Sequence, residues 1–230
     1  MRRIPEKKVD YEESYWGQIS DPDGIIRNRL TERDKQVENI KQEIAFINQQ
    51  QPGKIVDIGC GLGFLLSAID SQWKKHGVEI SKFASQYAEN WGEIFHGTVE
   101  EANYQNGYFD VVVIHHVIEH IEKPEVMIQE IYRILREGGH LIIATPDFDS
   151  GCARRFGKNY RLLHDDTHIS LFSYESMLRF LRDFGFLIDH VEFPFFETPY
   201  FTAENLMRLF DTTKISPPFY GNFMTFYCHK

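Results

Sequence analysis

Three glycines at alternate positions follow an acid in the segment Val56-Asp57-Ile58-Gly59-Cys60-Gly61-Leu62-Gly63. Glycine lets the backbone approach a ligand where a Cβ would collide, and it tolerates positive φ. A buried strand that runs into such a loop and then into a helix is how α/β proteins bind a nucleotide-like cofactor. Phe64 stands where a dinucleotide fold has its third glycine, and no Gly-Lys-Ser/Thr phosphate-loop ending follows. The spacing therefore argues against the usual dinucleotide and phosphate-loop patterns and leaves a nucleotide-like ligand, with a glycine-rich turn that binds nothing as the alternative.

A second acid, Glu79, ends the next apolar run. It follows Asp57 by about 20 residues, the distance at which nucleotide-binding α/β folds place the acid that contacts the ribose. A carboxylate there can accept hydrogen bonds from both ribose hydroxyls. Glu79 and the glycine segment together predict a site for a nucleotide-like ligand with a ribose, and an exposed glutamate at a strand end is the alternative.

A histidine cluster, His116-Val117-Ile118-Glu119-His120, matches the inverted zinc-protease pattern H-x-x-E-H. Zinc would need both histidines one turn apart on a helix, with a third ligand and an open position. His116 directly follows a β-branched run, and Pro124 limits a helix over residues 116 to 123. We therefore expect no metal, and expect Glu119 and His120 to brace a turn; a zinc hydrolase is the distant alternative.

Two further histidines, His164 and His168, lie downstream of the fifth expected strand, where open α/β sheets place their ligands. Histidine suits a general base near neutral pH. Asp165 or Asp166 could orient an imidazole. Solvated loop residues are the alternative for all four.

Three arginines precede these histidines: Arg154, Arg155 and Arg161. Arginine forks bind carboxylates and phosphates. They indicate either an anionic acceptor or a solvated basic loop.

Short strands and helices alternate through the middle of the chain. Strands are expected at residues 54–58, 76–80, 94–96, 110–115 and 140–145, and helices at 64–70, 82–91 and from Pro124 to a cap at Gly138. A helix is also expected from Thr31 to about residue 49, another after Ser173, and strands at 186–196 and 223–229. This alternation predicts an α/β fold with a mostly parallel sheet and helices on both faces.

The chain resembles the class I S-adenosylmethionine-dependent methyltransferases over about residues 53 to 195. Within them it is similar to the group of ubiquinone-biosynthesis O-methyltransferases and small-molecule methyltransferases. The segments that carry this are residues 56–63, Glu79, residues 109–113, 117–121 and 135–143. The resemblance implies a Rossmann-like seven-stranded sheet with a reversed C-terminal β-hairpin.

The resemblance also implies S-adenosylmethionine as the cofactor and roles at matching positions. Thr98 stands where the family often has an aspartate near the adenine. The residues expected to bind the cofactor are Asp57, Gly59, Cys60, Gly61, Gly63, Glu79, Ile80, Thr98, Val99 and His115. The candidate catalytic residues are His168, His164 and His116, of which His116 would lie beside the reacting methyl.

Two units are expected: an N-terminal helical lid at residues 1–52 and a cofactor-binding domain at residues 53–230. Substrate-binding insertions are expected at about residues 147–172 and 197–218. The acceptor should be a small molecule that could carry an anionic or sugar group, methylated on an oxygen of a sugar, lipid precursor or aromatic metabolite. The alternatives are a cofactor-binding regulatory module without turnover and, against the glycine spacing, a nicotinamide-dependent oxidoreductase.

Composition excludes several other classes. The formal net charge of −9 over 230 residues argues against a nucleic-acid partner. No apolar run reaches the roughly 20 residues of a membrane span. Three cysteines without CxxC pairing suit a reducing cytoplasm. A monomer or a homodimer is expected.

Overall fold

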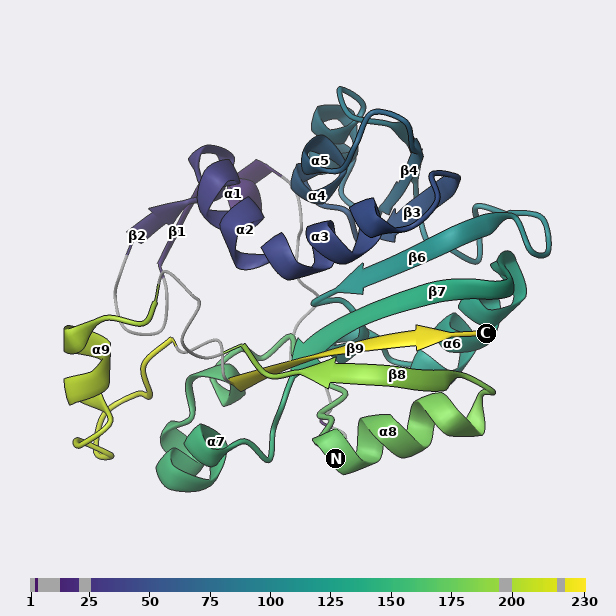
Figure 1. Cartoon of the computed structure of the whole chain (residues 1–230). Helices are drawn as coiled ribbons and strands as arrows, with labels where there is room; N and C mark the ends of the chain where they lie inside the picture. Colours follow the sequence, from purple (N-terminus) through teal and green to yellow (C-terminus); the bar gives the residue numbers. More distant parts are fainter. Residues whose placement is uncertain (1–2, 4–12, 21–25, 195–199, 219–221) are drawn as a thin grey trace.

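A seven-stranded sheet forms the centre of the molecule in the computed structural model, which describes residues 3, 13–20, 26–194, 200–218 and 222–230 (Figure 1). Its strand order is β5-β4-β3-β6-β7-β9-β8. β9 pairs antiparallel with both β7 and β8, and the other pairs are parallel. The strands are β3 (Lys54–Ile58), β4 (Lys74–Glu79), β5 (Glu93–His96), β6 (Phe109–His115), β7 (Leu135–Pro146), β8 (Leu187–Glu192) and β9 (Phe223–His229). The expected α/β fold class is confirmed.

Helices cover both faces of this sheet because side chains alternate along each strand. On β6, Val111 and Val113 pack in one core cluster with residues of α3 and α4, whereas Val112 and Ile114 pack in another with residues of α6 and α8. In Figure 1, α3, α4 and α5 lie above the sheet and α8 lies below it. These helices are α3 (Lys41–Gln49), α4 (Phe64–Ala68), α5 (Lys82–Ala88), α6 (Pro124–Ile134) and α8 (Tyr174–Asp183).

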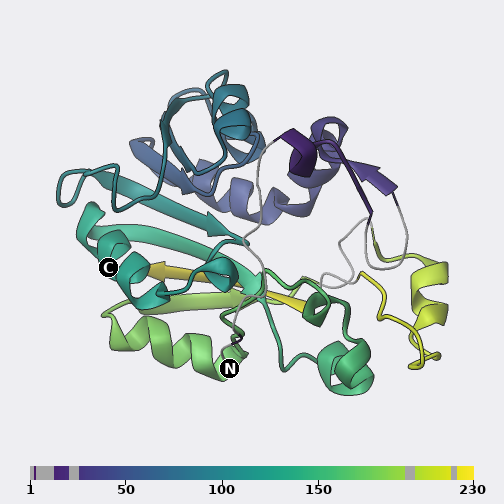
Figure 2. The same cartoon turned by 180° about the vertical axis from the view of Figure 1, so that it is seen from behind.

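Smaller elements gather where the parallel strands end. The remaining ones are α1 (Glu13–Trp16), a hairpin of β1 (Gln18–Ser20) and β2 (Ile26–Asn28), η1 (Arg29–Thr31), α2 (Arg33–Asn39), η2 (Ile118–His120), α7 (Gly151–Phe156), η3 (Gly157–Asn159), η4 (Arg161–Leu163) and α9 (Ala203–Arg208). Both views place the hairpin, α7 and α9 beyond the carboxyl ends of β6 and β7 (Figures 1 and 2). The acceptor-binding insertion expected at residues 197–218 starts outside the described residues.

Several helix boundaries differ from the sequence expectation: α2 begins at Arg33, α4 ends at Ala68 and α5 ends at Ala88. Two larger differences concern the first helix and α6. The helix expected from Thr31 is interrupted at Ile40, whose φ of −112° separates α2 from α3. Gly138 does not cap α6: the helix ends at Ile134, because the fully buried Leu135 already pairs with Phe109 in the sheet. Gly138 instead takes a φ of 67° within an irregular start of β7.

The N-terminal helices are not all peripheral. Ile47 of α3 is fully buried in the same core cluster as Ile55 of β3. A division of the chain after residue 52 stays a prediction. Within the described segments, every helix is too short or too polar to cross a lipid bilayer.

Candidate functional site

The candidate site lies where the order of the sheet changes direction. From β3 the chain adds β4 and β5 toward one edge, and then starts β6 on the other side of β3. Ligands of open α/β sheets bind at such a switch point, outside the carboxyl ends of the strands. The glycine loop follows β3 here, and His115 ends β6 beside it.

The glycine loop needs glycine for its backbone and for its packing. Gly59 and Gly61 have φ values of 73° and 51°. A Cβ on Gly59 would lie 2.3 Å from Val117 Cγ2, and one on Gly61 would lie 2.8 Å from the Trp16 ring. Side chains at these two positions would therefore be strained and would displace residues that line the site.

Glu79 joins the glycine loop to the end of β4. Its side chain is buried; Oε2 accepts a hydrogen bond from the Gly61 N–H at 2.8 Å, and Oε1 accepts one from the Ser81 N–H at 2.8 Å. Burial raises the pKa of Glu79, and the backbone donors oppose that rise. Each carboxylate oxygen can accept a second hydrogen bond, so Glu79 can still bind two hydroxyls.

Asp57 is a second buried carboxylate at this end of the sheet. Burial, followed by the charge of Glu79, raises the pKa of Asp57 to about 7. Among the described residues, none donates a hydrogen bond to its side chain. Asp57 lines a cavity, so a cationic group there would compensate a charge that the fold leaves uncompensated.

Two cavities open at this edge of the sheet. One, of about 540 Å³, is lined by Glu79, Ile80, Thr98 and Val99, and we call it the Glu79 cavity. The other, of about 450 Å³, includes Asp57, His115 and His168, and we call it the His168 cavity. Both volumes suit a small organic ligand. Trp16, Gly59, His116 and His120 line both cavities, so ligands in the two would meet there.

His116 is one of the polar residues that line both cavities. Its φ of 56° is unusual for a residue other than glycine, and its N–H donates to the Ala144 carbonyl at 3.0 Å. His116 Nδ1 donates to Glu119 Oε1 at 3.1 Å, and Thr145 Oγ1 donates to Glu119 Oε2 at 3.0 Å. Burial would raise the pKa of Glu119, but the bond from His116 and the nearby histidines lower it to about 2. Strained backbone of this kind persists where the surroundings hold it and often marks a functional site.

His168 lines the cavity named after it and is buried. Nδ1 is 2.7 Å from the Leu162 carbonyl oxygen, which can only accept, so Nδ1 carries the proton. The other nitrogen, Nε2, lies 3.8 Å from Asp165 Oδ2. The His168 and His120 rings lie 4.9 Å apart.

Comparisons with known proteins agree with this geometry. The family described as "Methyltransferase domain" matches residues 30–191. The chain belongs to this methyltransferase family. The expected class I S-adenosylmethionine-dependent methyltransferase is thereby confirmed, as family and as fold.

Individual relatives are more distant. An uncharacterized protein of Methanocaldococcus jannaschii is 28% identical over 64% of this chain and 71% of its own length. A ubiquinone biosynthesis O-methyltransferase of Pectobacterium atrosepticum is 28% identical over 44% of this chain, and the match spans about half, 48%, of that enzyme. A SAM-dependent methyltransferase structure from Archaeoglobus fulgidus has a TM-score of 0.63 at 18% identity, covering 87% of this chain and 98% of that one.

Most residues expected to bind the cofactor line at least one of the two cavities of the methyltransferase. Those are Asp57, Gly59, Cys60, Gly61, Glu79, Ile80, Thr98, Val99 and His115. Gly63 lines neither; it caps α4 with a φ of 74° and packs against Ala88. The contact of all these expected residues with a cofactor stays a prediction.

The candidate catalytic histidines separate in space. His116 and His168 line the His168 cavity. His164 is exposed, lines neither cavity, and its Nε2 lies 3.0 Å from the Lys158 carbonyl oxygen. The geometry of the methyltransferase therefore favours His168 over His164 as a group that reaches the acceptor.

His115 lies beside Glu43 of α3, with Nε2 and Oε1 3.7 Å apart. Burial lowers the pKa of His115 to about 3 and raises the pKa of Glu43 to about 7. His115 is thus neutral near pH 7, and this contact is not a strong ion pair.

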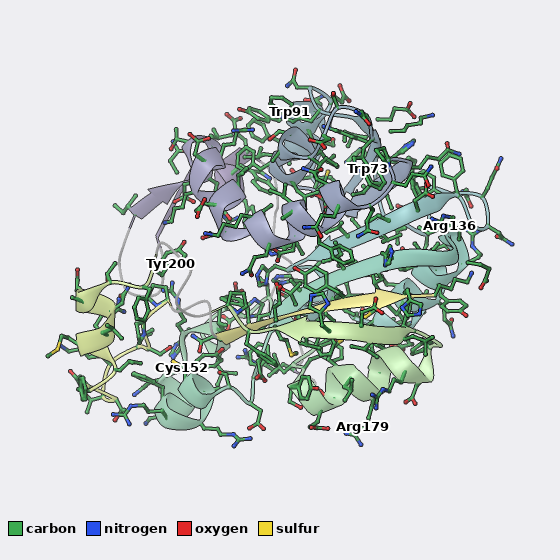
Figure 3. All side chains as sticks on the ribbon, in the orientation of Figure 1. Trp73, Trp91, Arg136, Cys152, Arg179 and Tyr200 are labelled. Carbon is green, nitrogen blue, oxygen red and sulfur yellow. The ribbon has the colours of Figure 1, made fainter. Side chains whose placement is uncertain are left out.

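Sequence reasoning missed the aromatic cover over the glycine loop. Trp16 of α1 donates from Nε1 to Ser81 Oγ at 3.1 Å, and the Arg29 guanidinium lies 3.7 Å from the centre of the Tyr15 ring. Tyr200, labelled in Figure 3, lines the His168 cavity near the hairpin. No motif marks these residues; only the folded chain brings them together.

The three arginines also differ in position. Arg161 is buried and lines the His168 cavity. Arg154 is exposed and pairs with Asp149, and Arg155 Nε donates to the Leu209 carbonyl at 2.7 Å. Only Arg161 of the three is near enough to contact an acceptor in this cavity.

Proposed function

We propose that this methyltransferase binds S-adenosylmethionine in the Glu79 cavity, with the ammonium end of the donor reaching Asp57 past the shared residues, and methylates an oxygen of a small molecule held in the remainder of the His168 cavity. The observation that carries the proposal is that both cavities share His116 and Gly59. A donor in one cavity and an acceptor in the other would therefore meet at one point. The buried Arg161 supports an acceptor with an anionic group.

The residues present fit the donor. Glu79 can accept from two ribose hydroxyls, and Asp57, to which no described residue donates, offers its carboxylate to an ammonium group. Ile80 and Val99 line the Glu79 cavity with apolar surface suited to an adenine. When bound, S-adenosylmethionine supplies a methyl group activated by a sulfonium centre.

The acceptor must lose a proton as it is methylated. His168 Nε2 carries the lone pair because Nδ1 donates to the Leu162 carbonyl, so Nε2 can take the hydroxyl proton. The hydroxyl proton would pass to Nε2, and the acceptor oxygen would bond to the methyl group that S-adenosylmethionine supplies, whose bond to sulfur would break with the electron pair left on sulfur. His116 and Trp16 line the shared wall and help to exclude water from this step.

The proposal extends to a reducing cytoplasm as the setting. Cys60 and Cys228 are buried free thiols, and Cys152 is a partly exposed one. Free thiols persist where the compartment keeps them reduced.

The test has two stages. Calorimetric titration with S-adenosylhomocysteine, the demethylated donor, should show one site per chain. Transfer of isotope-labelled methyl from S-adenosylmethionine is then measured on matched alcohols, phenols, amines and thiols, with and without a carboxylate or phosphate. Transfer to oxygen, best on the anionic compounds, is the expected result.

Other outcomes overturn parts of the proposal. Absence of product binding refutes the donor site. Transfer to nitrogen alone refutes the choice of oxygen. Donor binding without transfer to any compound favours a regulatory module in place of an enzyme.

A further inference from the structure

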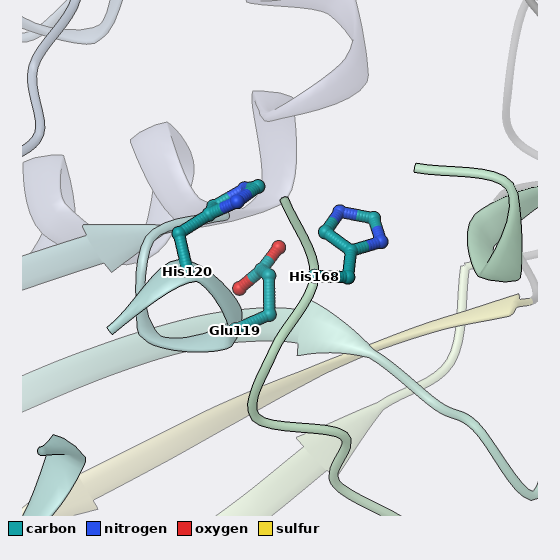
Figure 4. A group of neighbouring side chains, drawn as sticks. All are labelled: Glu119, His120 and His168. Atoms are coloured by element: carbon teal, nitrogen blue, oxygen red, sulfur yellow. The ribbon is translucent and has the colours of Figure 1, made fainter. Parts of the chain in front are cut away.

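Three potential metal ligands converge on the wall of the His168 cavity. Glu119 and His120 come from η2, and His168 comes from the segment after η4. One ligand atom from each lies within 4.8 Å of the other two. Figure 4 shows the Glu119 carboxylate between the two imidazole rings. All three residues line the same cavity.

Both imidazoles are held so that the same nitrogen remains available. Nδ1 of His168 lies 2.7 Å from the Leu162 carbonyl oxygen, and Nδ1 of His120 lies 3.1 Å from that of Thr167. A carbonyl only accepts, so each Nδ1 carries the proton and each Nε2 a lone pair. Histidines that bind metals are typically held in this way, by a second-shell bond to the nitrogen that does not ligate.

The carboxylate is also oriented by its neighbours. His116 Nδ1 donates to Glu119 Oε1 and Thr145 Oγ1 donates to Oε2. Each oxygen keeps a lone pair beyond the one these donors use. Glu119 is fully buried, so its position is fixed by packing as well as by these bonds.

We propose that Glu119, His120 and His168 bind a divalent transition-metal ion such as Zn²⁺, with open coordination positions toward the His168 cavity. Two imidazoles and one carboxylate are a donor set that binds such ions, and three protein ligands leave room for water or a substrate oxygen. The inference departs from the sequence expectation of no metal. The H-x-x-E-H pattern pointed to His116, which instead hydrogen-bonds to Glu119, whereas the third ligand is distant in sequence.

The role of this ion rests on the proposed function. A metal-bound acceptor hydroxyl ionises more readily. Its proton would pass to the partly exposed Asp165 carboxylate, 3.8 Å from His168 Nε2, and from there to solvent. His168 would then hold the metal and would not act as the base, because one lone pair cannot do both. The C–O bond would then form and the C–S bond break as above, and only the acceptor of the proton would differ.

The test measures metal binding without any acceptor. Protein treated with a chelator is titrated calorimetrically with Zn²⁺, and with Co²⁺ while the visible absorption of the bound ion is recorded. One Zn²⁺ per chain is expected, and Co²⁺ bands should report nitrogen and oxygen ligands. His168→Asn keeps a side-chain donor for the Leu162 carbonyl but removes Nε2, and should weaken Zn²⁺ by at least about 100-fold.

Two more variants make the result decisive. His120→Asn should weaken Zn²⁺ similarly. The matched control is His190→Asn, which removes an exposed histidine 3.8 Å from the Glu192 carboxylate on β8, and it should leave Zn²⁺ affinity unchanged. Equal Zn²⁺ affinity in the native protein, His168→Asn and His120→Asn overturns the inference, and so does no binding to the native protein.

Product binding separates this inference from the proposed function. S-Adenosylhomocysteine is titrated into the same chelated samples, and His168→Asn should bind it like the native protein, which also shows that the variant folds. Product binding without Zn²⁺ binding refutes the metal site alone. Zn²⁺ binding without product binding refutes the donor site and leaves the metal site standing.

Discussion

Two buried glutamates at the same edge of the sheet are held in different ways. Glu79 accepts its hydrogen bonds from backbone N–H groups of Gly61 and Ser81. Glu119 accepts them from the side chains of His116 and Thr145. Backbone donors are available in any sequence that forms the loop, whereas side-chain donors require particular residues. The surroundings of Glu79 can thus be specified by the loop that forms there, whereas the surroundings of Glu119 depend on parts of the chain that meet only on folding.

The largest effect is expected at Glu79. Glu79→Gln keeps the shape but removes the charge that the Gly61 N–H contacts and that we propose contacts the ribose hydroxyls. A hydrogen bond to a charged group contributes about 1.5–3 kcal/mol, so affinity for S-adenosylhomocysteine should fall by about 100-fold. Calorimetric titration measures it.

The control for this variant is Glu93→Gln, an exposed glutamate on the neighbouring strand β5. It should bind the product like the native protein. Equal affinity in Glu79→Gln and the native protein would mean that backbone groups alone hold the ribose, and the contrast between the two glutamates would lose its functional meaning.

Replacing Asp57 should have two smaller effects of opposite sign: a gain in stability and a loss of affinity for the product. Its folded pKa of about 7 exceeds the ordinary value of 3.8, so the folded state retains the proton longer than the unfolded chain. The stability this gives is present below pH 4 and is lost as the pH rises to about 7. Asp57→Asn should therefore raise the free energy of unfolding at pH 8 by about 1–3 kcal/mol.

The same variant should bind S-adenosylhomocysteine about tenfold less tightly, because a charge-assisted bond to its ammonium group becomes a neutral one. Denaturant unfolding at pH 8 and pH 5 measures the first effect, which should shrink at the lower pH. A variant that is less stable at pH 8 would contradict the inference that Asp57 is uncompensated without a ligand.

The smallest effect is expected at Trp16, which lines both cavities. Trp16→Phe keeps a ring over Gly61 but removes the Nε1 donor to Ser81 Oγ. One neutral hydrogen bond contributes about 1 kcal/mol, so product affinity should fall about fivefold. Trp91→Phe, at a half-exposed tryptophan beside Gly63 that lines neither cavity, serves as the control. A larger loss with Trp91→Phe would show that the loop is held from α5 and not from α1.

The difference between the two ends explains what the sequence could predict. Asp57, the glycine loop and Glu79 lie within one strand-helix-strand unit, so their spacing alone indicates their shared place. His116 and His168 were both proposed from sequence, but the approach of both to Glu119 was not, because the loop after β7 has no periodicity to reveal its path. Trp16 and Tyr200 come from opposite ends of the chain and reach the site only through tertiary packing.

The helix boundaries show the same difference between local and long-range interactions. Ser173 forms the expected cap of α8, a local hydrogen-bond exchange with Ser176. Gly138 was expected to end α6, but burial of Leu135 against Phe109 ends the helix earlier. A cap formed by neighbouring residues can be predicted from the sequence, whereas a strand pair between distant residues cannot.

The place of β9 in the sheet also sets the order in which the molecule can be completed. Among the described strands, β8 pairs with β9 alone, and β9 lies between it and β7. During synthesis β8 is made before β9, and its edge stays unpaired until residues 223–229 have been added. Such exposed edges invite pairing with other chains. Slow elongation between residues 192 and 223 should therefore favour aggregation of the nascent protein.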